Sequence, residues 1–175
     1  MPADSHSKRF PAKDGLPEVF LSEAGISPSS ECGKCHKDIY ASWKNSLHSM
    51  SISDPVFWSS YLQAYYEDSE KARKVCLGCH APLTGINNDY GLEQEITREG
   101  INCDFCHTIS EVIDGKKGRF TYRHEFGLLV QGPLRNIKSS VHRIRYNKLY
   151  KESRFCAGCH EYTNGNGIKL LETFS

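Results

Sequence analysis

Four pentapeptides of the form Cys-x-x-Cys-His combine residue types and spacing that point directly to chemistry. They are CGKCH at 32–36, CLGCH at 76–80, CDFCH at 103–107 and CAGCH at 156–160, and they use all eight cysteines of the 175 residues. In such a motif the two thiols add across the vinyl groups of a porphyrin, and the adjacent imidazole binds the iron as the proximal ligand. The pattern therefore predicts a tetrahaem cytochrome with four covalently attached c-type haems.

The predicted attachment residues are Cys32, Cys35, Cys76, Cys79, Cys103, Cys106, Cys156 and Cys159, and the predicted proximal iron ligands are His36, His80, His107 and His160. Paired thiols also build zinc ribbons, so two four-thiolate zinc sites are the main alternative. A ribbon needs no histidine after every second cysteine. A disulfide within a motif would be strained, because only two residues separate its cysteines. Both alternatives leave the four histidines unexplained, and we interpret the motifs as haem sites.

Four histidines outside the motifs, His6, His48, His124 and His142, equal in number the distal ligands that four bis-histidine haems require. His48 ends the helix that is expected after the first motif. About twelve residues of helix span about 18 Å, too far for His36 and His48 to bind opposite faces of one iron, so we expect His48 to bind a different haem. His142 precedes the last motif, and His124 follows a predicted hairpin. For His6, in a proline-interrupted segment, a surface position is the simpler alternative.

The sixth ligand of each iron decides the chemistry that is open to it. If His6 is not a ligand, one haem is five-coordinate, or Met50 binds it, or a neighbouring subunit supplies a histidine. Met50 lies two residues beyond His48, and we expect it to pack in the core instead. Iron with histidine on both faces only passes electrons, whereas an open iron also binds nitrite, hydroxylamine, NO or sulfur oxyanions.

Composition limits the alternatives. Hydrophobic residues make up only 38% of the chain, so we expect the porphyrins to form much of the apolar interior. The formal net charge is +1, and no basic run with interleaved aromatic residues indicates nucleic-acid binding. We expect the 22 Lys and Arg residues to face haem propionates and solvent. No apolar stretch is long enough for a membrane span.

Residues 1–30 contain Pro2, Pro11, Pro17 and Pro28 and are expected to form an extended arm. The segment lacks the apolar stretch of a signal peptide. Because haem is attached to thiols outside the cytoplasmic membrane, we expect a periplasmic or extracellular protein whose sequence is processed, trimmed or incomplete.

Hydrophobic spacing predicts the elements around the first two motifs. Ile39, Trp43 and Leu47 recur every four residues and predict a helix over 37–50. Asp54 followed by proline is typical of a helix start.

Further along the chain, Ser69 is expected to cap a short helix that runs into Cys76, and residues 81–100 resemble a series of turns. Ile109–Ile113 and Arg119–Arg123 predict a β-hairpin.

A helix near 146–158 is expected to deliver the fourth haem. The expected fold is therefore mainly α and loop-rich, a multihaem cytochrome fold wrapped around a stack of four c-type haems over residues 31–175, with one small β-hairpin.

The run ECGKCHKDIYASWKNSLHSMSISDPVF resembles the multihaem cytochromes of the cytochrome c-554 type (cytochrome c-552/4 domain) family, whose hallmark is a haem motif followed by a Trp-containing helix that ends in Ser-x-His. CLGCHAPL, GINCDFCHTI and FCAGCHEYTNGNGIKLLETFS are similar to relatives in the hydroxylamine oxidoreductase group. The resemblance implies His36 as a proximal and His48 as a distal ligand. It also implies haems packed in parallel and perpendicular pairs that relay electrons between periplasmic redox partners.

The sequence departs from enzymes of that group. It has no Cys-x-x-Cys-Lys motif, and nothing identifies a protein-crosslinked catalytic haem. Relatives continue past a segment like LLETFS, so we expect the chain to be a fragment of a larger multihaem protein.

Three functions follow from these patterns. The first is an electron carrier between extracytoplasmic redox partners through bis-histidine haems. The second is a haem oxidoreductase that acts on nitrogen or sulfur oxyanions at one open haem. The third is a subunit of a homo-oligomer or haem filament, in which neighbours exchange a histidine.

Overall fold

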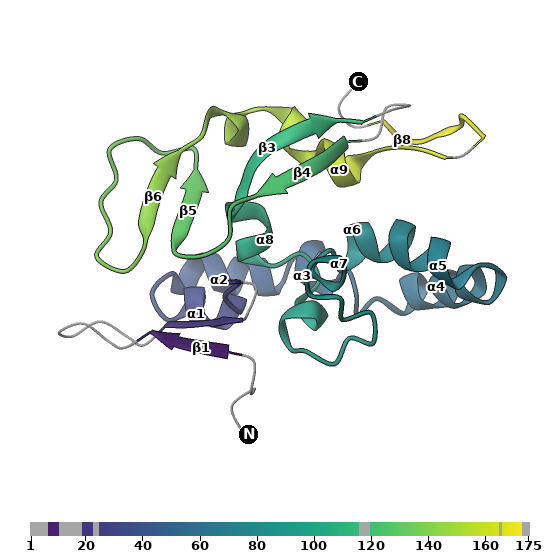
Figure 1. Cartoon of the computed structure of the whole chain (residues 1–175), viewed down its shortest axis with the longest axis horizontal. Helices are drawn as coiled ribbons and strands as arrows, with labels where there is room; N and C mark the ends of the chain where they lie inside the picture. Colours follow the sequence, from purple (N-terminus) through teal and green to yellow (C-terminus); the bar gives the residue numbers. More distant parts are fainter. Residues whose placement is uncertain (1–6, 11–18, 23–24, 116–119, 165, 173–175) are drawn as a thin grey trace. The chain divides into compact units, whose positions relative to one another are not determined.

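The computed structural model describes residues 7–10, 19–22, 25–115, 120–164 and 166–172. The chain divides into two compact units, Met1–Cys106 and His107–Ser175. The first unit consists mainly of short helices, and the second mainly of two-stranded sheets (Figure 1). A single haem domain over 31–175 after an N-terminal arm stays a prediction.

The first unit begins with a short antiparallel pair of strands, β1 (Ser7–Phe10) and β2 (Val19–Ser22), and continues as helical segments. These are α1 (Ser29–Gly33), α2 (Lys37–Lys44), α3 (Leu47–Met50), α4 (Pro55–Glu67), α5 (Ser69–Ala72), the π-helical η1 (Arg73–Leu77), α6 (Gly78–His80), α7 (Leu83–Asn87), the 3-10 helix η2 (Ile96–Glu99) and α8 (Cys103–His107), which ends on the first residue of the second unit.

The single helix expected over 37–50 is wrong, because α2 ends at Lys44 and α3 begins only at Leu47. Ser46 Oγ accepts a hydrogen bond from the Ser49 N–H at 3.4 Å and caps α3. Ser49 Oγ donates to the carbonyl oxygens of Lys44 and Ser46, each at 2.9 Å. Serine side chains compete with the helix for backbone groups, which explains the break.

The expected start of α4 is confirmed, because Asp54 Oδ1 accepts a hydrogen bond from the Val56 N–H at 2.8 Å. The cap assigned to Ser69 is wrong. Asp68 caps α5 instead, through a hydrogen bond of 3.0 Å from the Lys71 N–H to its Oδ1. Aspartate is among the preferred residues at this position, so the local rule holds one residue earlier.

The turn-rich segment expected at residues 81–100 also contains α7 and η2. Asp89 organises the loop between them. Its carboxylate accepts hydrogen bonds from Thr97 Oγ1 at 2.6 Å and from the N–H groups of Glu93 at 3.0 Å and Gln94 at 2.8 Å. Burial alone would raise the pKa of Asp89, but these donors outweigh it and the pKa lies below its ordinary value. The ionised carboxylate therefore stabilises the folded loop.

One hydrophobic cluster of the first unit lies where α4 packs against the second motif. Its buried residues are Ile52, Phe57, Tyr61, Ala72, Leu77 and Ala81. The rings of Phe57 and Tyr61 are stacked with centroids 5.6 Å apart. By contrast, α2 and α3 contain no buried residue.

The described residues of the second unit form three strand pairs, which are drawn in green and yellow in Figure 1. Antiparallel β3 (Ile109–Asp114) and β4 (Phe120–His124) confirm the expected hairpin, with a bulge between Ile109 and Glu111. The other pairs are the parallel β5 (Leu129–Gly132) and β6 (Arg143–Tyr146), and the antiparallel β7 (Glu161–Thr163) and β8 (Lys169–Glu172). The described residues thus combine helices with several small sheets, and they form more sheet than the mainly α fold with one hairpin that was expected.

The helix expected near 146–158 is wrong. The chain instead forms two 3-10 helices, η4 (Lys148–Lys151) and η5 (Ser153–Cys156), followed by α9 (Ala157–His160). Asn147 starts η4 by accepting a hydrogen bond from the Leu149 N–H at 3.0 Å. Glu152 is extended, with φ −114° and ψ 137°, and this separates the two turns.

Replacement of Asp89 by asparagine should lower the free energy of unfolding of the mature protein by about 1–3 kcal/mol. One carboxylate oxygen, which accepts hydrogen bonds, would become an NH₂ group that points at other hydrogen-bond donors. Asp89 has a lowered pKa in the folded state, so its contribution is present above its unfolded pKa and is lost as the pH falls through the folded value. Urea denaturation at several pH values measures both effects. Asp54→Asn is the matched control, because asparagine caps a helix as well as aspartate. Equal denaturation midpoints for the two variants would contradict the prediction.

Candidate haem sites

Each Cys-x-x-Cys-His motif forms a tight helical turn. In the first motif the His36 N–H donates to the carbonyl oxygen of Cys32 at 2.9 Å. The third motif coincides with α8, while η1 and α6 carry the second and η5 and α9 carry the fourth. Residues three and four apart share one side of a helix, so both thiols and the imidazole of a motif lie on the same face.

In the fourth motif the turn packs on the hairpin of the second unit. Tyr122 OH donates to the carbonyl oxygen of Phe155 at 2.9 Å and accepts a hydrogen bond from the Gly158 N–H at 2.9 Å. A Cβ at residue 158 would collide with the Tyr122 ring, so glycine is required inside this motif.

The described cysteines form neither a disulfide nor a cluster of potential metal ligands. All eight cysteines are described, and none is disulfide-bonded. Within the part of the chain that the structure describes, no three His, Cys, Asp or Glu residues gather as a metal site would require. The two four-thiolate clusters of the zinc alternative are therefore not formed. Across motifs, the Cys32 and Cys103 thiols are close enough to shift each other's pKa, that of Cys32 upward and that of Cys103 downward.

Two of the predicted proximal ligands are held through their Nδ1 atoms. His80 Nδ1 lies 2.9 Å from the carbonyl oxygen of Ser51, and His107 Nδ1 lies 2.8 Å from that of Gln131. With the proton on Nδ1, Nε2 is the atom that would bind iron, and the carbonyl partner raises its basicity. This is the arrangement expected of a proximal histidine.

His80 is fixed by two further contacts. Ser51 Oγ donates to the carbonyl oxygen of His80 at 2.7 Å, and the Phe57 ring stacks on the imidazole with centroids 4.1 Å apart. Ser51 thus holds both the side chain and the backbone of this residue. The sequence analysis missed this role, because an isolated serine carries no signal for it.

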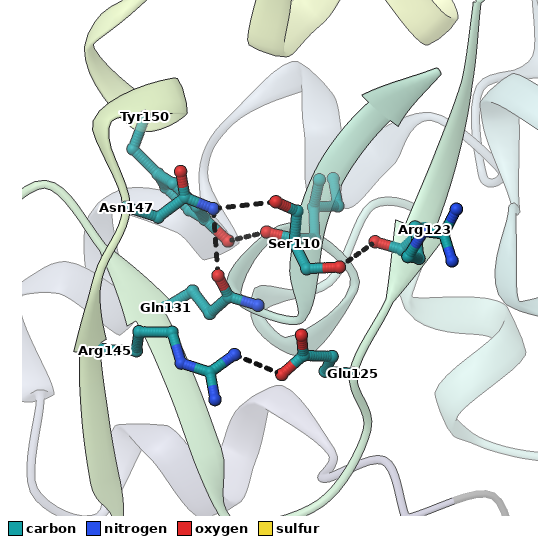
Figure 2. A network of polar contacts seen from close by, with 8 residues as sticks. Ser110, Arg123, Glu125, Gln131, Arg145, Asn147 and Tyr150 are labelled. Atoms are coloured by element: carbon teal, nitrogen blue, oxygen red, sulfur yellow. Dashed lines mark hydrogen bonds and ion pairs between the residues drawn. The ribbon is translucent and has the colours of Figure 1, made fainter.

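His107 depends on the polar network drawn in Figure 2. Gln131 is buried, and its Oε1 accepts a hydrogen bond from Asn147 Nδ2 at 2.9 Å. The same Nδ2 donates to the Ser110 carbonyl oxygen at 3.0 Å. Tyr150, whose ring stacks on the His107 imidazole at 5.9 Å, donates through its hydroxyl to the carbonyl oxygen of residue 109 at 3.0 Å. The network fixes the carbonyl group that orients His107.

Among the candidate distal ligands, His48 is exposed on α3, and its backbone is firmly held. Its carbonyl oxygen accepts hydrogen bonds from the Ile101 N–H at 3.0 Å and from Ser51 Oγ at 2.9 Å. Gly100 has φ +69°, and a Cβ there would lie 2.5 Å from this oxygen. Trp43 Nε1 donates to the carbonyl oxygen of Ile101 at 2.8 Å. These contacts place His48 beside segments that lead to the second and third motifs, and its pairing with a particular iron stays a prediction.

His124 ends β4 in a half-buried position. Its Nδ1 lies 3.0 Å from Thr108 Oγ1, and its ring stacks on Phe126 with centroids 5.1 Å apart. Burial lowers the pKa of His124 to about 4, so the imidazole is neutral at pH 7. Neutral imidazole is the form that binds metals.

The remaining candidates differ in their surroundings. His142 lines an open cavity of about 800 Å³ together with Leu128, Ile137 and Lys138. His36 and His160 are exposed at the ends of their motif turns. His6 lies outside the described residues.

Side chains near the motifs fit a haem. Ile39 and Leu47, on the helices after the first motif, are 67% and 85% exposed, as suits residues that cover a porphyrin face. Met50, expected in the core, is 41% exposed. Arg73 precedes the second motif, and its buried Nε has no hydrogen-bond partner among the described residues, while its Nη2 donates to Tyr65 OH at 2.9 Å. A buried guanidinium with an unused donor fits a propionate.

Comparisons with known proteins agree with this chemistry. Residues 31–108 match the family described as cytochrome c554 and c-prime. The fold resembles that of a penta-haem cytochrome c552 from Thermochromatium tepidum, with a TM-score of 0.66 and 24% sequence identity over 86% of this chain and 49% of that chain. The chain therefore spans about half the length of that cytochrome. Comparison with curated protein sequences gives no match.

None of the described helices has the length and apolar character needed to cross a membrane. The matched segment contains the first three of the four haem motifs, and the shared fold extends the likeness through most of the chain. Residues 31–108 therefore match the cytochrome c554 family, and the chain has the fold of a multihaem c-type cytochrome.

Proposed function

We propose that the chain carries electrons between extracytoplasmic redox partners through four bis-histidine haems. The eight motif cysteines would hold the haems, and His36, His80, His107 and His160 would bind the irons from the proximal side. His48, His124, His142 and His6 would supply the distal ligands. When bound, a haem iron takes up and releases single electrons at a potential set by its ligands and their hydrogen bonds.

The contact between Cys32 and Cys103 is the observation that carries this proposal. The two residues belong to different motifs, and their side chains are close enough that each shifts the pKa of the other. Haems held at touching thiols are neighbours, and electron transfer requires such neighbours. This proximity supports electron transfer between two haems of the chain, rather than four haems that act separately.

The residues around the motifs would also tune the irons. Ser51 and Gln131 present carbonyl oxygens to His80 and His107, which makes these imidazoles stronger donors. Stronger donors favour the ferric state and lower the reduction potential. Imidazole on both faces of the iron acts in the same direction, relative to His/Met ligation.

The surface charge favours an acidic partner for the second unit. Residues 107–175 contain 12 Lys and Arg against 6 Asp and Glu, whereas residues 1–106 contain 10 against 15. The exposed cations of the second unit include Arg135, Lys138, Arg143, Lys148 and Lys151. Lys138 and Arg143 border the cavity that His142 lines, so the cationic surface surrounds a candidate haem ligand. Opposite charge on a partner would steer encounters to this site.

Multihaem c-type cytochromes act outside the cytoplasm together with redox partners. We propose the periplasm or the cell exterior for this chain, since its thioether chemistry takes place there.

The mature protein should be heavier than the polypeptide by four haems. A Cys76→Ser, Cys79→Ser double variant should lose one of the four, because no thiol remains at that motif. Mass spectrometry and iron analysis measure both numbers. A colourless protein with the mass of the bare chain, or one that holds zinc, would contradict the haem count and the carrier together.

His48→Ala should convert one of four low-spin ferric centres to high spin, because the iron loses its distal ligand. Electron paramagnetic resonance of the oxidised protein counts the centres, and cyanide should bind the opened iron. Met50→Leu, two residues away, is the control and should leave the spectrum unchanged. A spectrum unaltered in His48→Ala removes this residue from the ligand set. A high-spin centre in the unaltered protein favours the oxyanion-reducing alternative instead.

Charge reversal on the second unit should slow reaction with an anionic oxidant. A Lys138→Glu, Arg143→Glu variant should react with hexacyanoferrate(III) about tenfold more slowly at low ionic strength, because electrostatic steering is lost. The difference should disappear in about 1 M salt, where the Debye length is only about 3 Å. Stopped-flow rates measure this. Lys44→Glu, Lys71→Glu makes the same change in the first unit, and an equal loss of rate there would rule out a localised site.

A further inference from the structure

We propose that Glu99 binds a proton when the haems attached through Cys32 and Cys103 are reduced, so that the first unit couples proton uptake to electron uptake. This inference deepens the proposed function and rests on haem attachment at these two cysteines. It adds a proton-binding residue to a chain that otherwise only conducts electrons.

Glu99 ends η2, and its carboxylate is held by residues of two other segments. Its Oε1 and Oε2 accept hydrogen bonds from the Ser29 N–H at 3.1 and 3.0 Å. Oε2 also accepts from Ser29 Oγ at 2.9 Å and from Asn102 Nδ2 at 3.3 Å. Ser29 is fully buried. Such a carboxylate is held at a fixed place inside the unit and is not a mobile surface charge.

The same contacts connect Glu99 to both attachment sites. Ser29 begins α1, which contains Cys32, and Ser29 Oγ accepts a hydrogen bond from the Cys103 N–H at 3.3 Å. The negative charge of Glu99 disfavours ionisation of both thiols, and these thiols contact each other. Glu99 therefore lies close enough to both attachment points to respond to charge there.

The charged neighbours of Glu99 are mostly negative. Asp104, on α8, is buried and accepts a hydrogen bond from the Ser27 N–H at 2.6 Å. Glu95, beside η2, is exposed and adds a further negative charge. The thiols of Cys32 and Cys103 also lie within reach of the charge of Glu99, and attachment would convert them to uncharged thioethers. Among the described residues, no Lys or Arg forms an ion pair with Glu99.

Burial raises the pKa of Glu99, although the hydrogen bonds from Ser29 and Asn102 oppose this. Each electron that reaches a nearby iron adds one negative charge, and like charges favour the protonated carboxyl group. A one-electron donor reduces ferric to ferrous iron, a proton from solvent binds Glu99 Oε, and no other bond changes. The reduced protein therefore binds more protons, and its reduction potential falls as the pH rises between the oxidised and reduced pKa values.

Spectroelectrochemical titration of the mature protein at a series of pH values tests this coupling. We expect a pair of haems in the unaltered chain to become harder to reduce with rising pH. The reduction equilibrium constant should change by up to tenfold per pH unit, or about 59 mV for one electron. Glu99→Gln should abolish this slope. Glu95→Gln, which removes the same formal charge from an exposed position, should leave the slope in place. A slope that persists in Glu99→Gln would overturn the inference.

Ser29→Ala tests the same coupling in a second variant, so the test does not depend on whether the Glu99→Gln protein acquires its haems. It removes one donor to the carboxylate, so the pH window of the slope should move upward, and an unmoved window would overturn the inference. In the unaltered protein, the reduced-minus-oxidised infrared difference spectrum should show a carboxylic acid C=O band on reduction, and its absence would count equally against Glu99.

Mass analysis separates the two proposals. A chain without haem at Cys32 and Cys103 would overturn both. A haem-loaded chain with pH-independent potentials would overturn only the role of Glu99.

Discussion

Buried hydrogen bonds around Ser29 join parts of the first unit that are far apart in sequence. Ser29 and Glu99 are separated by 70 residues, and the Ser27 N–H donates to Asp104 across 77 residues. These bonds act beside buried apolar side chains such as Ile26, Ile96 and Phe105, whereas α2 and α3 bury none. A hydrogen bond to a charged and buried acceptor is stronger than one between neutral groups, so a small number of them positions the first and third motifs.

In the second unit, another network of side-chain hydrogen bonds joins segments that are distant in sequence. Asn147, which precedes η4, donates hydrogen bonds to Gln131 on β5 and to the Ser110 carbonyl oxygen at the start of β3 (Figure 2). Tyr150 on η4 donates to the carbonyl oxygen of the residue before Ser110. All three residues contribute to the setting of one imidazole, that of His107. A short strand pair has little stability alone, and such side-chain bonds supply what a larger sheet would provide.

The parts that could be predicted from the sequence are those that depend on neighbours in the chain. The haem motifs, the Asp54 cap and the β3–β4 hairpin each follow from a few consecutive residues. The break at Ser46 was missed because a regular apolar spacing concealed the competing serine hydroxyls. The parallel pairing of β5 with β6, and the roles of Ser51 and Gln131, depend on residues brought together only by folding, for which a local pattern has no signal.

The proximity of Cys32 and Cys103 also matters for a chain whose thiols are still free. The neighbouring Cys32 side chain lowers the pKa of Cys103 and so favours its thiolate, the nucleophilic form of cysteine. A chain that compacts in an oxidising compartment before cofactor insertion would bring these sulfurs together and expose them to cross-linking. Attachment of either thiol to haem would remove this partner and with it the route to a cross-link.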